Sequence, residues 1–139
     1  MKKFLCTFLI FFIHNLHAVK IGDIAPNFKA STTIGDLTFH EWANESWIVL
    51  FSHPGDFTPV CTTELASVAQ LQPEFNKRNV KVIALSGDSV KDHQEWIPHI
   101  NSFKDTLKRD GSLLSMIKNW KEDTDINYPI IADEDFSIS

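Results

Sequence analysis

The sequence has very little cysteine: Cys6 and Cys61 are the only two in 139 residues. Cys6 lies within residues 1–18, which have the layout of a secretory signal peptide: two lysines, an apolar run over residues 4–13, and Ala18 as the small residue before the cleavage point. We expect cleavage after Ala18. Cys61 is then the only cysteine of the mature chain, which excludes an intramolecular disulfide.

A long hydrophobic run is absent too. The apolar run over residues 4–13 is about half of the roughly 20 residues that a helix needs to span a bilayer. Stable membrane insertion is therefore not expected. A used signal places the protein in the secretory pathway or outside the cell, and a cytoplasmic location is the alternative.

The chain also lacks any block of like charge, any internal repeat and any sign of disorder. Its 13 basic and 18 acidic side chains give a net charge of -5. This charge pattern argues against nucleic acid or an anionic membrane as the main partner and is compatible with a small neutral substrate. The apolar fraction of 43% is enough to bury the core of one domain, which we place at residues 19–139.

Strand-like and helix-like patches alternate from Ile21 onward, which indicates an α/β domain. A short hairpin is predicted for residues 28–39, with its turn at Ile34-Gly35-Asp36. Three further strands are predicted at residues 47–51, 81–86 and 128–133. The first of these is continuously apolar, which is typical of a strand buried on both faces.

Helical spacing begins at or just before Cys61 and continues to about Asn79, with a kink or a restart expected at Pro73. Gly87-Asp88-Ser89 supplies the turn and the N-cap of a second helix. The order strand, helix, strand, helix predicts a parallel core. Residues 104–125 are polar and irregular, with a short amphipathic helix broken by a glycine as the expected structure.

The start of a helix suits a reactive thiol at Cys61. A cysteine reacts as its thiolate, and the unpaired N–H groups and dipole of a first helical turn favour negative charge there. His53 is near enough in the sequence to add a hydrogen bond or a positive charge.

The spacing of Pro54, Thr58 and Cys61 puts a ring, a hydroxyl and a sulfur at one loop-to-helix junction. Thr58 can accept a hydrogen bond from a peroxide O–H, Pro54 can exclude water, and attack of the thiolate on an O–O bond leaves a sulfenic acid.

Residues 50–54, Leu-Phe-Ser-His-Pro, and residues 56–65, Asp-Phe-Thr-Pro-Val-Cys-Thr-Thr-Glu-Leu, closely resemble the active-site signature of the 1-Cys peroxiredoxins. Flanking stretches resemble further parts of the same family: residues 22–28, 80–85, 88–93 and 129–133. The resemblance implies a thioredoxin-like peroxiredoxin fold of the α/β class. It also implies a thiol-dependent peroxidase that reduces hydrogen peroxide and organic hydroperoxides, in antioxidant defence and redox homeostasis.

The resemblance assigns a role to each residue of the signature. Cys61 becomes the peroxidatic cysteine, Thr58 and Pro54 its pocket partners, and His53 a further pocket residue, while Glu64 helps to hold the arrangement. We expect no cofactor and no metal. An external thiol such as glutathione would regenerate the cysteine. Family members are often dimers, so a homodimer is one candidate assembly, although much of the dimer-forming C-terminal portion would be absent from this chain.

Two departures from the family pattern bear on activity. The family's catalytic arginine lies on a strand downstream of the Pro129-Ile130-Ile131 segment, and neither Arg78 nor Arg109 is at a matching position. We therefore expect a fold that is incomplete at the C-terminus, and residues 102–127 are longer than their family counterpart. A catalytically impaired or non-catalytic fragment is the alternative to an active peroxidase.

Other chemistries have weaker signals. A zinc site formed by His53 and Cys61 lacks two further ligands at suitable spacing, and a disulfide oxidoreductase lacks a second cysteine. A lipase-like pairing of Ser46 with His40 lacks both glycines of the usual nucleophile elbow. The remaining aromatic and histidine side chains are interpreted as surface or packing residues, with Trp42 or Trp47 as candidates to line the pocket: Trp42, Trp47, His93, Trp96, His99 and Trp120.

Overall fold

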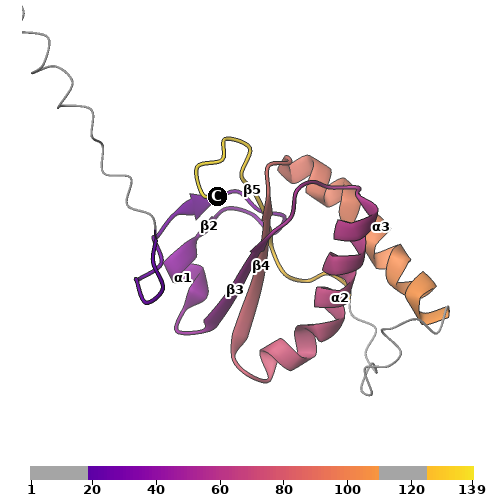
Figure 1. Cartoon of the computed structure of the whole chain (residues 1–139), viewed down its shortest axis with the longest axis horizontal. Helices are drawn as coiled ribbons and strands as arrows, with labels where there is room; N and C mark the ends of the chain where they lie inside the picture. Colours follow the sequence, from indigo (N-terminus) through magenta and orange to yellow (C-terminus); the bar gives the residue numbers. More distant parts are fainter. Residues whose placement is uncertain (1–18, 110–124) are drawn as a thin grey trace, which may run out of the picture.

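Three parallel strands with the order β3-β4-β5 form the centre of the fold (Figure 1). The structure, a computed structural model, describes residues 19–109 and 125–139. Its elements are β1 (Lys29–Ala30), β2 (Leu37–Thr38), α1 (Phe39–Ala43), β3 (Trp47–Ser52), α2 (Pro59–Asn76), β4 (Val80–Ser86), α3 (Val90–Arg109) and β5 (Ile130–Ala132). The predicted hairpin, parallel core and α/β order are confirmed.

Strand β4 separates two apolar clusters, because successive side chains of a strand point to opposite faces. Val82 and Ala84 belong to the cluster beneath α2 and α3, which also contains Cys61. Ile83 and Leu85 belong to the cluster on the other face, which the hairpin and α1 cover (Figure 1). The sheet is therefore covered on both faces, and the helical layer that carries Cys61 lies on one of them.

Strand β3 was predicted to be buried on both faces, and this prediction is wrong. None of its residues is buried: each is exposed or partly exposed, and Trp47 is 78% exposed. Among the described residues β3 pairs only with β4, from Trp47↔Val80 to Ser52↔Leu85, so it is an edge strand. An apolar run reveals a preference for burial but does not reveal which neighbours supply it.

The homodimer considered from the sequence stays a prediction.

Helix α2 begins two residues before Cys61, as expected. Pro59 occupies its first turn, where a missing N–H costs nothing because that donor has no helical partner. The helix continues without a restart through Pro73 and ends at Asn76, three residues earlier than predicted. Asn79 then takes a left-handed backbone conformation (φ 53°) at the entry to β4.

Helix α3 starts with a reciprocal cap, because the Asp92 N–H donates to Ser89 Oγ (3.2 Å) and the Ser89 hydroxyl donates to Asp92 Oδ2 (2.6 Å). The backbone is helical as far as Arg109, so the irregular stretch does not begin at residue 104. The predicted break at Asp110-Gly111 and most of the predicted short helix lie outside the described residues. The backbone N–H of Ile126 donates to Asn101 Oδ1 (3.0 Å), which joins the two sides of this stretch.

No helix in the described parts of the chain is both long enough and apolar enough to cross a membrane. Residues 1–18, which carry the predicted signal, lie outside the described residues.

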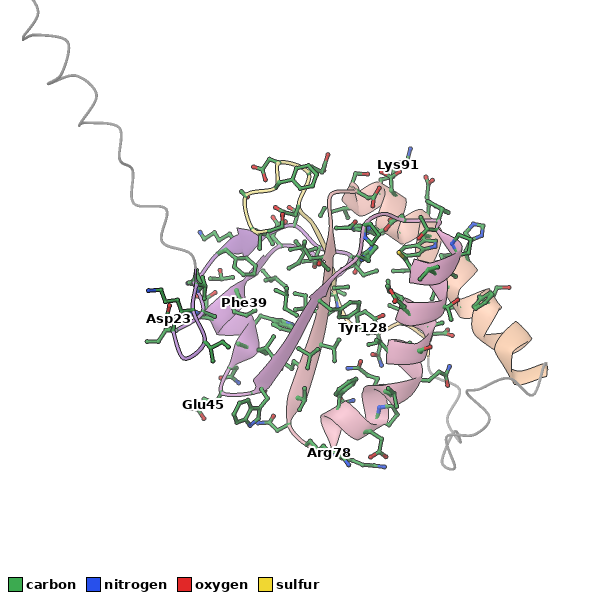
Figure 2. The ribbon with its side chains drawn as sticks, viewed as in Figure 1. Asp23, Phe39, Glu45, Arg78, Lys91 and Tyr128 are labelled. Carbon is green, nitrogen blue, oxygen red and sulfur yellow. The ribbon has the colours of Figure 1, made fainter. Side chains whose placement is uncertain are left out.

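Tyr128, the only tyrosine of the chain, locks β5 to α2. Its buried hydroxyl donates to the backbone carbonyl of Leu65 (2.9 Å), and its ring packs edge-on against Phe51. Figure 2 places it between the sheet and α2. Burial raises the pKa of Tyr128 well above its ordinary value near 10.

We expect Tyr128 to resist ionisation until the protein unfolds. A folded-state pKa above the unfolded value contributes stability that is fully present below about pH 10 and is lost as the pH rises further. In an alkaline titration, tyrosinate absorbance at 295 nm should rise together with the loss of circular dichroism. The variant Tyr128→Phe, which has no tyrosine, should show no such signal. A smooth titration near pH 10 with an intact dichroism spectrum would contradict this expectation.

Candidate active site

Cys61 is in the first turn of α2 and is 2% exposed. The helix begins there because Thr58 takes an extended N-cap conformation and Pro59 follows with a backbone angle already suited to a helix. No acidic side chain occupies this first turn. The free N–H groups and the helix dipole therefore favour negative charge on the sulfur.

Residues 53–58, the active-site loop, connect β3 to α2 through a strained turn. Phe57 has a left-handed backbone (φ 56°), which is rare for a bulky side chain and costs about 1–3 kcal/mol. Its half-exposed ring packs on Trp96 (6.2 Å between centroids) and edge-on against His99 (5.5 Å). The Thr58 hydroxyl donates to the Gly55 carbonyl (3.2 Å), so its oxygen keeps a lone pair with which to accept a further hydrogen bond.

Asp88, on the turn between β4 and α3, ties down the backbone of the active-site loop. Its Oδ2 accepts the backbone N–H of Asp56 (2.9 Å) and the hydroxyl of Ser86 (2.7 Å). The loop is therefore fixed to the carboxyl end of the neighbouring strand.

The side chain of Asp56 lies between two imidazoles. His53 Nε2 donates to Asp56 Oδ1 (2.9 Å), and His93 Nδ1 donates to Asp56 Oδ2 (2.6 Å). His93 Nε2 also donates to the backbone carbonyl of Ile131 on β5 (3.1 Å). Burial by itself raises the pKa of Asp56, but the hydrogen bonds and charges of His53 and His93 outweigh it and hold that pKa below its ordinary value. We call His53, Asp56 and His93 the His-Asp-His network.

Trp96 joins this network to the thiol. The indole N–H donates to the hydroxyl of Thr62 (3.2 Å), and the ring lies 5.3 Å from that of His53 between centroids. Trp96 and Cys61 belong to the same buried cluster. The tryptophan beside the site is thus on α3, whereas Trp42 packs on the opposite face of the sheet and Trp47 is exposed at the start of β3.

The predicted site residues differ in where they lie. The structure places His53 and Thr58 in the loop that leads to Cys61, with His53 and Cys61 both buried, while Pro54 is exposed on that loop. Glu64 is also exposed, and it makes no hydrogen bond or ion pair with the described residues. Its predicted holding role has no contact to support it.

Asp56 and Asp88 were not predicted as site residues, and His93 was given only a surface or packing role. His93 is in fact fully buried and hydrogen-bonded on both ring nitrogens. The sequence offered one signal for the network: Asp56 lies inside the signature, three residues after His53, so the two side chains could have been predicted to interact. Its partners come from a turn and a helix whose approach no local pattern predicts.

Arg78 lies at the end of α2 opposite Cys61, where it pairs with Glu74 (Figure 2). The lipase-like pair is not assembled either. His40 Nε2 donates to the carbonyl of Ala25 (2.8 Å), and the Ser46 hydroxyl donates to Asn79 Oδ1 (3.0 Å).

The His-Asp-His network is also the one group of three potential metal ligands among the described residues, with donor atoms within 4.8 Å of one another. Two of its atom pairs are only 2.6 and 2.9 Å apart. Metal bonds of about 2.0 Å in a tetrahedral site would hold neighbouring ligand atoms roughly 3.3 Å apart. The spacing fits shared protons better than a shared cation.

Comparison with known proteins places this geometry in a family. The model of the AhpC/TSA family matches residues 21–139. Peroxiredoxin-6 of Mus musculus is 49% identical over 125 residues, which covers 81% of this chain and 56% of the mouse protein. The chain thus spans about half the length of the curated relatives it matches.

Two solved structures share the thioredoxin-like peroxiredoxin fold. A cysteine-to-serine mutant of peroxiredoxin 6 of Arenicola marina is 46% identical, with a TM-score of 0.71 over 87% of this chain and 48% of that one. A yeast mitochondrial 1-Cys peroxiredoxin, studied for thiol resolving via glutathione/thioredoxin systems, is 43% identical, with a TM-score of 0.68 over 84% of this chain and 46% of that one. Since the family model matches well over half of the chain, the protein belongs to the AhpC/TSA family.

Proposed function

We propose that the protein is a thiol-dependent peroxidase in which Cys61 reduces hydrogen peroxide and organic hydroperoxides. The observation that carries this proposal is the buried Cys61 in the first turn of α2, beneath a loop with the 1-Cys signature. The thiolate attacks one oxygen of the O–O bond, an S–O bond forms, and the other oxygen leaves with the electron pair and takes up a proton. The products are a sulfenic acid and water or an alcohol.

Regeneration then requires a thiol from outside the chain. Cys61 is the only cysteine among the described residues, so a partner thiol for its sulfenic acid must come from another molecule if the signal segment with Cys6 is removed. The related yeast enzyme was studied with glutathione/thioredoxin systems. We propose a small thiol of the glutathione type as the reductant.

Thr58 orients the peroxide in this proposal. Because its hydroxyl hydrogen is used on the Gly55 carbonyl, its oxygen presents a lone pair as an acceptor. The side chain makes no capping hydrogen bond to α2, so its loss would not remove a cap. Positioned donors and acceptors of this kind lower the barrier by holding the reacting atoms in line.

The first test compares peroxide consumption by the full chain and by Cys61→Ser, with dithiothreitol as the reductant. We expect the substitution to abolish consumption, because the reacting group is the thiolate of Cys61 and a serine hydroxyl does not ionise near neutral pH. The matched control Cys6→Ser should keep the wild-type rate. Equal rates in wild type and Cys61→Ser would rule out the proposal, and a folded but inactive wild type would favour the non-catalytic alternative.

The second test concerns the hydroxyl at residue 58. Thr58→Val keeps the shape and removes the acceptor, so the rate of Cys61 oxidation by hydrogen peroxide should fall roughly 100- to 1000-fold, the range for loss of one positioned hydrogen-bonding group. Thr58→Ser should retain most of the rate. Stopped-flow measurement at several peroxide concentrations decides, and a Val variant as fast as the Ser variant would remove Thr58 from the mechanism.

We also propose that residues 1–18 direct the chain into the secretory pathway. The support is their sequence layout alone, a basic start, a short apolar run and a small residue at Ala18. A reporter fused after Val19 should be recovered from the culture medium of transfected cells, and replacing two leucines of the apolar run by aspartate should retain it inside. Retention of both reporters would favour the cytoplasmic alternative.

A further inference from the structure

We propose that His93 is a positioning residue: it carries the positive charge that balances Asp56 and so keeps His53 neutral, with the Nδ1 lone pair of His53 available to the peroxide reaction. The inference rests on the proposed peroxidase function. It adds to that function a buried charge on α3, away from the loop that carries the signature.

The partners of His93 determine its protonation. Nδ1 faces the carboxylate of Asp56 at 2.6 Å, and Nε2 faces the carbonyl of Ile131 at 3.1 Å. Neither a carboxylate nor a carbonyl can donate a hydrogen bond, so each ring nitrogen must carry its own proton. An imidazole with two N–H groups is a cation, and His93 is fully buried.

Asp56 supplies the matching negative charge. Its two oxygens accept one hydrogen bond from each histidine, and the lowered pKa of this carboxyl agrees with an ionised form. The other nearby acids are occupied elsewhere: Asp88 accepts the N–H of Asp56 and the Ser86 hydroxyl, and Asp133 accepts two backbone N–H groups at the C-terminal end of the described chain. One carboxylate thus serves two imidazoles.

His53 must therefore be the uncharged member of the network. A second imidazolium would leave a buried positive charge without a counterion, which is costly in a protein interior. His53 gives its Nε2 proton to Asp56, so a neutral ring leaves Nδ1 as an acceptor. That atom is buried and has no hydrogen-bond partner among the described residues, and the ring is 5% exposed.

An unpaired, buried acceptor beside Trp96 suits a proton carrier for the thiol. Because Nδ1 of His53 is not hydrogen-bonded to the Cys61 sulfur, the bound hydroperoxide passes the proton on: it takes up the S–H proton and gives its own O–H proton to Nδ1. The thiolate then attacks the peroxide, and the O–O bond breaks. The leaving oxygen then takes the proton back from His53, so thiol and hydroperoxide become sulfenic acid and alcohol without any further reactant. A positioned base contributes only if it is neutral before the reaction starts.

Two variants separate this role from simple packing. His93→Gln keeps a donor to Asp56 but removes the positive charge, so His53 should become doubly protonated and lose its acceptor. The double variant Asp56→Asn with His93→Gln removes both charges, so His53 should be neutral again. A purely structural role predicts that the double variant is worse than the single one, whereas charge balance predicts rescue.

The measurement is a long-range ¹H–¹⁵N correlation spectrum of the histidine side chains in the full chain at pH 7, with the six histidines assigned by substitution. In the wild type we expect two protonated nitrogens on His93 and a bare Nδ1 on His53. Stopped-flow oxidation by hydrogen peroxide should be roughly 10- to 100-fold slower in His93→Gln and at least partly restored in the double variant. The exposed His40→Gln is the matched control and should change neither readout.

Several outcomes would overturn the inference. A bare nitrogen on His93 in the wild type would do so, as would a neutral His53 in His93→Gln or a double variant no faster than the single one. If His93→Gln does not fold by near-ultraviolet dichroism, the wild-type spectrum and the double variant still decide. A wild type with the expected spectrum but no peroxide reduction would instead overturn the peroxidase function, and with it the catalytic use of this charge balance.

Discussion

Three parts of the fold meet at the carboxylate of Asp56: the active-site loop, helix α3 and, through His93, strand β5. The attraction between a buried carboxylate and a buried imidazolium is strong because little water is present to screen it. Removing one member of such a pair typically costs about 3–5 kcal/mol, since the other charge is then buried alone. The network thus anchors the loop that contains the strained Phe57 and that leads to Thr58 and Cys61 at the start of α2.

The sequence was sufficient to predict the helices, most strands and the reactive cysteine, because each of them depends on residues that are close together in the chain. A proline two residues before Cys61 marks the first turn of a helix, and the apolar β4 run marks a central strand. The capping pair Ser89 and Asp92 is likewise visible as a spacing. Each of these features depends on residues within a few positions of one another.

What could not be read from the sequence depends on contacts between distant segments. Strand β3 is exposed because only β4 pairs with it among the described strands, and the residues of β3 alone do not indicate how many strands will pair with it. His93 recurs at helical spacing with buried residues, yet only the packed fold reveals that a carboxylate and a carbonyl occupy its two sides. Glu64 shows the opposite case, since its place in the signature suggested contacts that no residue in the described part of the chain provides.

The hydrogen bond from the Ile126 N–H to Asn101 Oδ1 ties the second half of α3 to the stretch that leads into β5. It closes a loop of chain between α3, which carries His93, and β5, whose Ile131 carbonyl accepts a hydrogen bond from the His93 ring. The entropy of closing a loop grows only with the logarithm of its length, about 0.6 kcal/mol for each doubling. A longer connection between these two residues therefore adds little to the free-energy cost of bringing α3 and β5 together at His93.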